Sequence, residues 1–220
     1  MGAERSGLRL IQFTREPVPG QVKTRMLPAL QPEAASDLHR ELTLWTLREL
    51  CQYGHRPVEL SVAGDPHHVF FDSCRQIGDV TVTTQVEGDL GERMHAALLA
   101  GLAASRKVIL VGSDCPGIDG EYLRGAELAL DSDEVVLGPA LDGGYVLIGV
   151  RSVQRAWFEG IAWGGNTVYR DTTARLQGTG TRFSALAPLA DIDRPEDLEL
   201  WRSIKGGENA SGARARGLRR

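Results

Sequence analysis

The sequence predicts an α/β fold in which a mostly parallel sheet is covered by helices on both faces. Short apolar runs rich in β-branched residues alternate with longer segments whose apolar residues recur at helical spacing. The 220 residues fit one domain of this kind, and the chain is long enough to bury a sizeable core. No apolar run approaches the roughly 20 residues that a membrane-spanning helix needs, and we find no internal repeat or interdomain linker.

The expected strands are short apolar runs bounded by glycine, proline or polar turn residues. The clearest is the run VILV, residues 108–111, which ends abruptly in Gly112, Ser113 and Asp114. Pro116 then prevents continued strand pairing. In chain order the expected strands are residues 8–13, 58–62, 80–83, 108–111, 135–137, 145–150 and 182–186.

The expected helices place apolar residues three or four positions apart, so that they share one face. The first starts after Pro32 and carries Leu38 and Leu42 at this spacing. Asn166 is expected to cap the fourth helix, and Pro195 stands in the first turn of the last. In chain order the expected helices run from residue 32 to about 50, and over 90–104, 120–130, 166–176 and 195–204.

Charge and cysteine content narrow the class of protein. The net charge is −4, and residues 205–220 carry five cations and one acid, so the rest of the chain is acidic and is not expected to bind nucleic acid. That tail has few apolar residues and is expected to be disordered, which leaves residues 1–204 as the folded domain. The N-terminus lacks the long apolar core of a secretory signal. The sparse cysteines, Cys51, Cys74 and Cys115, form no CxxC pair and indicate a reducing cytoplasm.

Asp114 is the first candidate for a functional role. A carboxylate at the carboxyl end of a buried parallel strand lies at the edge where open α/β sheets bind ligands. No cation is close to it in sequence, which suits a hard divalent metal that holds a phosphorylated substrate. The alternative is a turn former or a helix N-cap, both of which are common after a strand.

The loop FTREPVPGQVKTR follows the first expected strand, and two of its cations stand close together near its end. Gly20 allows the backbone to approach a ligand closely. Lys23 and Arg25 stand two positions apart, so in an extended loop both could face one side and bind a diphosphate. The loop matches neither GxxxxGK[ST] nor GxGxxG, and a solvated basic loop is the alternative.

The segment QVEGDLGERM, residues 85–94, comes directly before a helix. Asp89 and Glu92 have the spacing of a capping box, and this structural interpretation competes with a role in binding. It leaves Gln85 and Arg93 unexplained, and Gln85 could read a base through its amide. We therefore count Gln85, Gly88, Asp89 and Arg93 as candidate nucleotide-binding residues.

Two further acidic segments follow. In GPALDGGY, Asp142 precedes two glycines; it could form a tight turn, or bind an acceptor hydroxyl or act as a base at the sheet edge. In ADIDRPEDL, Asp193 and Glu196 have capping-box spacing, which leaves Asp191 freer to be a second metal ligand. The five histidines are scattered and do not suggest a metal cage.

Taken together, these segments resemble the bacterial DUF2064 family of GT-A-type glycosyltransferases over about residues 8–204. The resemblance rests on KTR after a Pro-Gly loop, QVEGDLGERM, VGSDCPGI, GPALDGGY and DIDRPEDL, in this order. It implies a three-layer α/β/α nucleotide-diphospho-sugar transferase fold with a mixed seven-stranded sheet, and a divalent metal at Asp114. Ser113, Asp114 and Cys115 replace the Asp-x-Asp pair of many such enzymes, so metal binding would need Asp191 or the nucleotide's phosphates.

The resulting hypothesis is a cytoplasmic, metal-dependent glycosyltransferase that uses a nucleotide sugar and a small-molecule acceptor. Lys23 and Arg25 would neutralise the diphosphate, Asp114 would hold Mg²⁺ or Mn²⁺, and Asp142 and Tyr145 would lie on the acceptor side, with Asp142 as general base. One alternative is a nucleotidyltransferase that uses an NTP to activate a small phosphorylated acid or sugar. A second is a non-catalytic nucleotide-binding regulator, and no oligomeric state is predicted.

Overall fold

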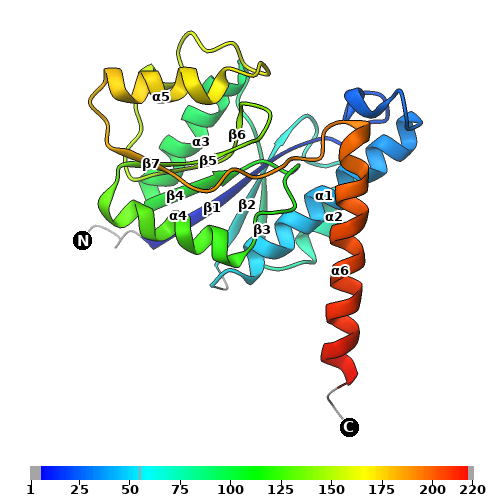
Figure 1. The fold of residues 1–220 in the computed structure, drawn as a ribbon. Coiled ribbons are helices and arrows are strands. Elements are labelled where there is room, and N and C mark those ends of the chain that lie inside the picture. The colour runs from blue at the N-terminus through cyan, green and yellow to red at the C-terminus, as the bar shows by residue number, and fades with distance from the viewer. Residues whose placement is uncertain (1–5, 55, 218–220) are drawn as a thin grey trace.

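The computed structural model describes residues 6–54 and 56–217 and has a seven-stranded mixed sheet in the order β3-β2-β1-β4-β6-β5-β7 (Figure 1). β6 is antiparallel to both of its neighbours, and the other pairs are parallel. The α/β prediction with a mostly parallel sheet is therefore confirmed. The strands are β1 Ser6–Arg15, β2 Val58–Ala63, β3 Val80–Thr84, β4 Ser105–Val111, β5 Val135–Pro139, β6 Tyr145–Val150 and β7 Phe183–Ala185.

Helices cover both faces of this sheet. Leu10 and Ile11 are adjacent in β1 and fully buried, but they belong to different core clusters, because successive side chains of a strand point to opposite faces. One cluster packs beneath α1, α2 and α4, and the other beneath α3 and α5. The helices are α1 Pro32–Gln52, α2 Phe70–Arg75, α3 Leu90–Ala104, α4 Gly120–Ser132, α5 Val168–Gly178 and α6 Leu198–Gly217.

The structure corrects two helix predictions. The short helix α2 was not expected, because six residues are too few to show helical periodicity, and tertiary burial of Phe71 and Cys74 stabilises it. Helix α5 begins after Thr167 rather than Asn166, and the Thr167 side chain makes no capping hydrogen bond.

The last helix is longer than expected. α6 continues past residue 204 to Gly217, so the backbone of residues 205–217 is helical where the sequence predicts a disordered tail. Its first turns are anchored by Trp201, whose ring meets that of Trp45 at a centroid distance of 5.1 Å, and by Lys205, which lies 2.7 Å from Glu41 Oε2. Once a helix is nucleated, each added residue gains one backbone hydrogen bond. Figure 1 shows α6 extending away from the body of the molecule.

The carboxyl ends of β1 and β4 lie side by side in the middle of the sheet. Gln12 pairs with Val111, so the end of β1 and the turn that follows β4 meet at one edge. In the part of the chain that the structure describes, no helix combines the length and apolar character needed to cross a membrane.

Candidate functional site

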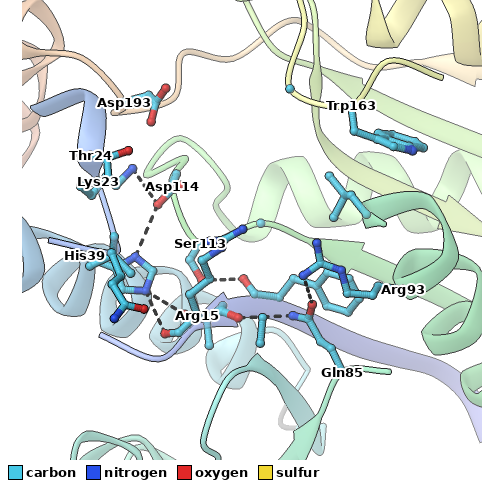
Figure 2. A pocket seen from close by; sticks show the side chains of 18 of the residues that line it. Arg15, Lys23, Thr24, His39, Gln85, Arg93, Ser113, Asp114, Trp163 and Asp193 are labelled. Atoms are coloured by element: carbon cyan, nitrogen blue, oxygen red, sulfur yellow. Dashed lines mark hydrogen bonds and ion pairs between the residues drawn. The ribbon is translucent and has the colours of Figure 1, made fainter. Parts of the chain in front are cut away.

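A cavity of about 650 Å³ opens at this edge of the sheet (Figure 2). Its walls come from the end of β1, the loop that follows it, the start of α3, the turn after β4 and the loop around Trp163. Most of the residues expected at the nucleotide site line it, namely Lys23, Arg25, Gln85, Asp89, Arg93 and Asp114. The sequence motifs thus converge at one place, as the α/β prediction requires.

Lys23 ties three loops together. It is the one non-glycine residue with a positive φ among those described, at 50°, and its side chain is only 2% exposed. The ammonium donates a hydrogen bond to the carbonyl oxygen of Ile192 and lies 2.8 Å from Asp114 Oδ1. The backbone N–H of Ile192 in turn donates to the carbonyl oxygen of Asp114, at 2.8 Å. The Lys23 ammonium therefore holds these segments together, and the Asp114 carboxylate already compensates its charge.

Asp114 lies at the floor of the cavity, and its two carboxylate oxygens have different surroundings. Oδ1 is buried against Lys23 and accepts no well-directed hydrogen bond, whereas the side chain as a whole is 44% exposed. The exposed part therefore belongs chiefly to the other oxygen, on the cavity side. Burial raises the pKa of Asp114, but the charge of Lys23 and the weaker effect of His39 outweigh it, so the pKa lies below its ordinary value. The carboxylate is ionised at neutral pH.

His39 was not expected in the site, because nothing in its sequence neighbourhood marks it. Its Nε2 lies 3.1 Å from the carbonyl oxygen of Arg15, so the neutral ring donates from Nε2 and leaves Nδ1 unprotonated, 4.0 Å from Asp114 Oδ1. Burial lowers the pKa of His39, and Lys23 adds to that effect against the opposing charge of Asp114. The ring is consequently neutral at neutral pH.

Both ends of the Gln85 amide are hydrogen-bonded to other groups of the protein. Its Nε2 donates to the carbonyl oxygens of Ser61, at 2.9 Å, and Thr14, at 3.3 Å. Its Oε1 accepts a hydrogen bond from Arg93 Nη1, at 3.2 Å. The amide expected to read a base instead orients Arg93, which also donates from Nε to the carbonyl oxygen of Asp89.

Gly88 and Asp89 form the start of α3. Asp89 Oδ1 accepts from the Glu92 N–H at 2.9 Å, and Glu92 Oε2 accepts from the Asp89 N–H at 3.1 Å, which is a complete capping box. Gly88 has a φ of 125°, a conformation that a side chain would strain. Gly20, with a φ of 79°, turns the first loop in the same way. The capping interpretation of Asp89 and Glu92 is confirmed.

Arg25 stands between this cavity and a smaller one of about 230 Å³, because it lines both. Its Nη1 lies 2.6 Å from Asp193 Oδ2, and its Nη2 donates to the carbonyl oxygen of Gly164 at 3.4 Å. The smaller cavity also contains Asp142 and Asp191. The capping box expected from Asp193 and Glu196 is wrong.

The cap of that turn comes from Asp197. Its Oδ2 accepts hydrogen bonds from the backbone N–H groups of Asp193 and Arg194, at 2.9 and 2.7 Å. The carboxylate of Asp193 is thereby left to pair with Arg25.

Tyr145 is not brought to either cavity. Its hydroxyl faces Met94 Sδ at 3.8 Å, and burial raises its pKa above the ordinary value. Cys115 is similarly remote from chemistry, because it is 1% exposed and burial raises the pKa of its thiol to about 12.

The donor set allows a divalent cation that a nucleotide helps to hold. Within the described residues, no group of three or more His, Cys, Asp or Glu side chains forms a metal cage. Burial raises the pKa of Asp191, the negative charges of Asp142, Asp193 and Asp114 add to this effect, and the resulting pKa is about 6. A cation beside Asp191 and the open oxygen of Asp114 would relieve this repulsion, and Mg²⁺ commonly combines one or two carboxylates with substrate phosphates.

Comparisons with known proteins agree with the fold. The model of the family DUF2064, described as an uncharacterized protein conserved in bacteria, matches residues 46–165, more than half of the chain. A structure from Desulfovibrio desulfuricans G20, which carries the provisional name nucleotide-diphospho-sugar transferase, is 29% identical with a TM-score of 0.78, over 86% of this chain and 83% of that one. No curated protein matches the chain at a significant level.

Two more distant structures share the fold alone. One is a 4-diphosphocytidyl-2C-methyl-D-erythritol synthase from Anaerococcus prevotii DSM 20548, with 10% identity and a TM-score of 0.62 over 91% of this chain and 96% of that one. The other is an inositol-1-phosphate CTP transferase from T. maritima, with 13% identity and a TM-score of 0.57 over 88% and 93%. The expected nucleotide-diphospho-sugar transferase fold is therefore confirmed.

Proposed function

The chain belongs to the DUF2064 family, and on that premise we propose that it is a transferase whose donor is a nucleotide sugar. The observation that carries the proposal is the 650 Å³ cavity, in which arginine side chains and Asp114 face one space at the carboxyl edge of β1 and β4. Phosphate groups are bound by arginine through charge-assisted hydrogen bonds, and a carboxylate beside them suits a cation that bridges to phosphate. The name of the Desulfovibrio desulfuricans protein supports the same donor class.

The smaller cavity is assigned to the acceptor. Asp142 Oδ1 accepts a hydrogen bond from the Gly144 N–H at 2.9 Å, which fixes the carboxylate and leaves its second oxygen for a ligand. In an inverting reaction, Asp142 takes the proton of an acceptor hydroxyl as that oxygen attacks the anomeric carbon. The bond from this carbon to the diphosphate oxygen breaks, and the nucleoside diphosphate leaves.

The cofactor belongs to the same proposal. Asp114 and Asp191 would hold Mg²⁺ or Mn²⁺ together with the donor phosphates, and the cation would stabilise negative charge on the leaving diphosphate. Lys23 keeps Asp114 ionised and in place, through the ion pair at 2.8 Å. His39, neutral and hydrogen-bonded to β1, fills the space behind that carboxylate.

A nucleotidyltransferase is the second candidate, because two structures of the same fold are named for cytidylyl transfer. Such an enzyme would cleave an NTP between its α- and β-phosphates and release pyrophosphate. The smaller cavity argues against a phosphorylated acceptor, because four carboxylates and only two guanidinium groups line it, and this excess of negative charge would repel an anion. A hydroxyl acceptor meets no such repulsion.

The two reactions are separated by their products. We expect a panel of nucleotide sugars with Mn²⁺ to include one that releases nucleoside diphosphate, slowly without acceptor because water enters the acceptor cavity. We expect no pyrophosphate from any NTP. Asp114→Asn and Asp142→Asn should abolish the release, whereas Asp72→Asn, on the exposed surface of α2, should not.

Three outcomes would reject the proposal in different ways. Pyrophosphate from an NTP and a phosphorylated acid would assign nucleotidyl transfer. Nucleotide binding without any turnover would assign a regulator. Release of nucleoside diphosphate by the Asp114→Asn variant would show that the reaction does not need the proposed metal site.

A further inference from the structure

The cations of the large cavity fall into two classes. Lys23 and Arg25 are each within 2.8 Å of a carboxylate oxygen, on Asp114 and Asp193 respectively. Arg15 and Arg93 also line the cavity, but neither has a carboxylate within ion-pair distance among the side chains that the structure describes, those of residues 7–54 and 56–207. Asp89 also lines the cavity beside Arg93, so the two arginines leave that end with a net positive charge, whereas the end at Lys23 and Arg25 is close to neutral.

Arg93 is held in position by neutral acceptors. Its Nε donates to the carbonyl oxygen of Asp89 at 3.2 Å, and its Nη1 donates to Gln85 Oε1 at 3.2 Å. Gln85 is itself fixed by the backbone of Ser61 and Thr14. Both acceptors are uncharged, so they orient the guanidinium without neutralising it. Among the described residues, the N–H groups of Nη2 have no hydrogen-bond partner.

Arg15 supplies a second charge to the same space. It is the last residue of β1, it is exposed, and its guanidinium makes no hydrogen bond within the described residues. Figure 2 shows Arg15 on the cavity floor between Asp114 and Arg93. Burial lowers the pKa of Arg93, and repulsion from the charge of Arg15 adds to this effect against the opposing charge of Asp89. An anion placed between them would remove this repulsion.

We propose that Arg15 and Arg93 form a diphosphate clamp, and that Gln85 is the positioning residue that aims Arg93 into it. This inference rests on the proposed function and adds an orientation to it. The diphosphate lies between these two arginines and the cation proposed at Asp114, and the sugar points toward Asp193 and the acceptor cavity. Lys23 and Arg25, which the sequence marks as the phosphate ligands, instead hold the loops in place.

The test uses inorganic pyrophosphate, which carries the recognised group without a base or a sugar. Its affinity is measured by calorimetry on the full chain, and nucleoside diphosphates are compared with the parent nucleosides. Arg15→Gln and Arg93→Gln each remove one charge and keep a polar side chain. We expect each to weaken pyrophosphate about tenfold or more, because charge-assisted hydrogen bonds are the strong ones. The affinity of a nucleoside should not change.

Two variants serve as controls. Arg25→Gln removes a cation from the same cavity, but one that Asp193 already pairs, so it should cost much less affinity. Arg106→Gln removes an exposed cation at the start of β4, away from the cavity, and reports any effect of net charge alone.

Gln85→Met tests the positioning role of Gln85, because it should preserve the charge of Arg93 but loosen its orientation. We expect it to raise the dissociation constant for pyrophosphate and to leave the effect of Arg15→Gln intact.

The clamp is refuted if Arg25→Gln weakens pyrophosphate as much as Arg15→Gln and Arg93→Gln do, or if pyrophosphate does not bind at all. A folded variant is verified by its unchanged melting temperature. Failure of the proposed function has a different signature. If pyrophosphate binding depends on both arginines but no nucleotide sugar is turned over, the clamp stands and the transferase assignment falls.

Discussion

Replacing Lys23 by methionine tests whether this residue is a structural tie or a phosphate ligand. Methionine keeps most of the apolar stem of the buried side chain and removes only the ammonium. The carbonyl oxygen of Ile192 then loses its donor, which costs about 1–3 kcal/mol for a buried acceptor. The lost ion pair with Asp114 adds about 1 kcal/mol, because that carboxylate is 44% exposed and solvent screens the pair.

The expected destabilisation is therefore about 2–4 kcal/mol. For a chain of this size each kcal/mol corresponds to about 2–4 °C in the melting temperature, so the shift should be about 5–15 °C. Thermal and urea unfolding measure it, with Arg25→Met as the control. Arg25 and Asp193 are 50% and 26% exposed, so that pair should contribute less than about 1 kcal/mol.

The pH dependence has a definite sign. The folded-state pKa of Asp114 is depressed, so its contribution to stability is present above the unfolded pKa of about 4 and is lost as the pH falls through the folded value. The stability difference between the wild type and Lys23→Met should accordingly shrink in acid. A variant as stable as the wild type at pH 7, but with weakened pyrophosphate binding, would refute the structural role.

Three further predictions follow from the site and the last helix. Asp114→Asn should remove the metal-dependent part of nucleotide stabilisation, which at 100 times the dissociation constant is about 2.7 kcal/mol, or roughly 5–10 °C, in a thermal-shift assay with Mn²⁺. Asp191→Asn should raise the melting temperature above pH 6 in the absence of metal. The folded-state pKa of Asp191 is raised, so its contribution to stability is present below the unfolded pKa and is lost as the pH rises to about 6. An unchanged pH profile of the melting temperature would argue against the repulsion between these carboxylates. Removal of residues 206–220 should leave unfolding and turnover unaffected, because the last buried hydrophobic of α6 found in the described residues is Trp201; a large loss on truncation would show that the segment docks.

The fold was largely predictable because its signal is local. Most strands are apolar runs that end in turn residues, and α1, α3 and α4 show their apolar faces in residues three or four positions apart. The parts that failed lack such a signal. Helix α2 is shorter than two turns, and α6 continues past Ile204 although the residues beyond it show no apolar periodicity.

The location of the site was also predictable, because strand ends of a parallel sheet converge at one edge. The roles of individual side chains were not. Lys23 and Arg25 stand two residues apart in a basic loop, yet acids distant in sequence, Asp114 and Asp193, lie within 2.8 Å of them. Arg15 lies in the same basic loop, ahead of the Lys23 and Arg25 pair, and no sequence pattern singles it out, while His39 looks like one position on a helix face. Only the tertiary contacts separate paired cations from open ones.

The difference between paired and unpaired charges determines which side chains of the cavity are able to bind an incoming ligand. A cation that is already paired with a carboxylate must give up that partner before it binds phosphate. The free energy of the lost ion pair therefore reduces the net free energy of phosphate binding. A cation oriented by neutral acceptors, as Arg93 is by Gln85 and the Asp89 carbonyl, meets no such competition. The same reasoning holds for the acids: Asp193 is satisfied by Arg25, whereas Asp191 has its pKa raised to about 6 by burial and by neighbouring carboxylates. The unsatisfied charges, Arg15 and Arg93 at one end and Asp191 with the open oxygen of Asp114 at the other, are therefore those expected to change partner when a metal-bound nucleotide enters.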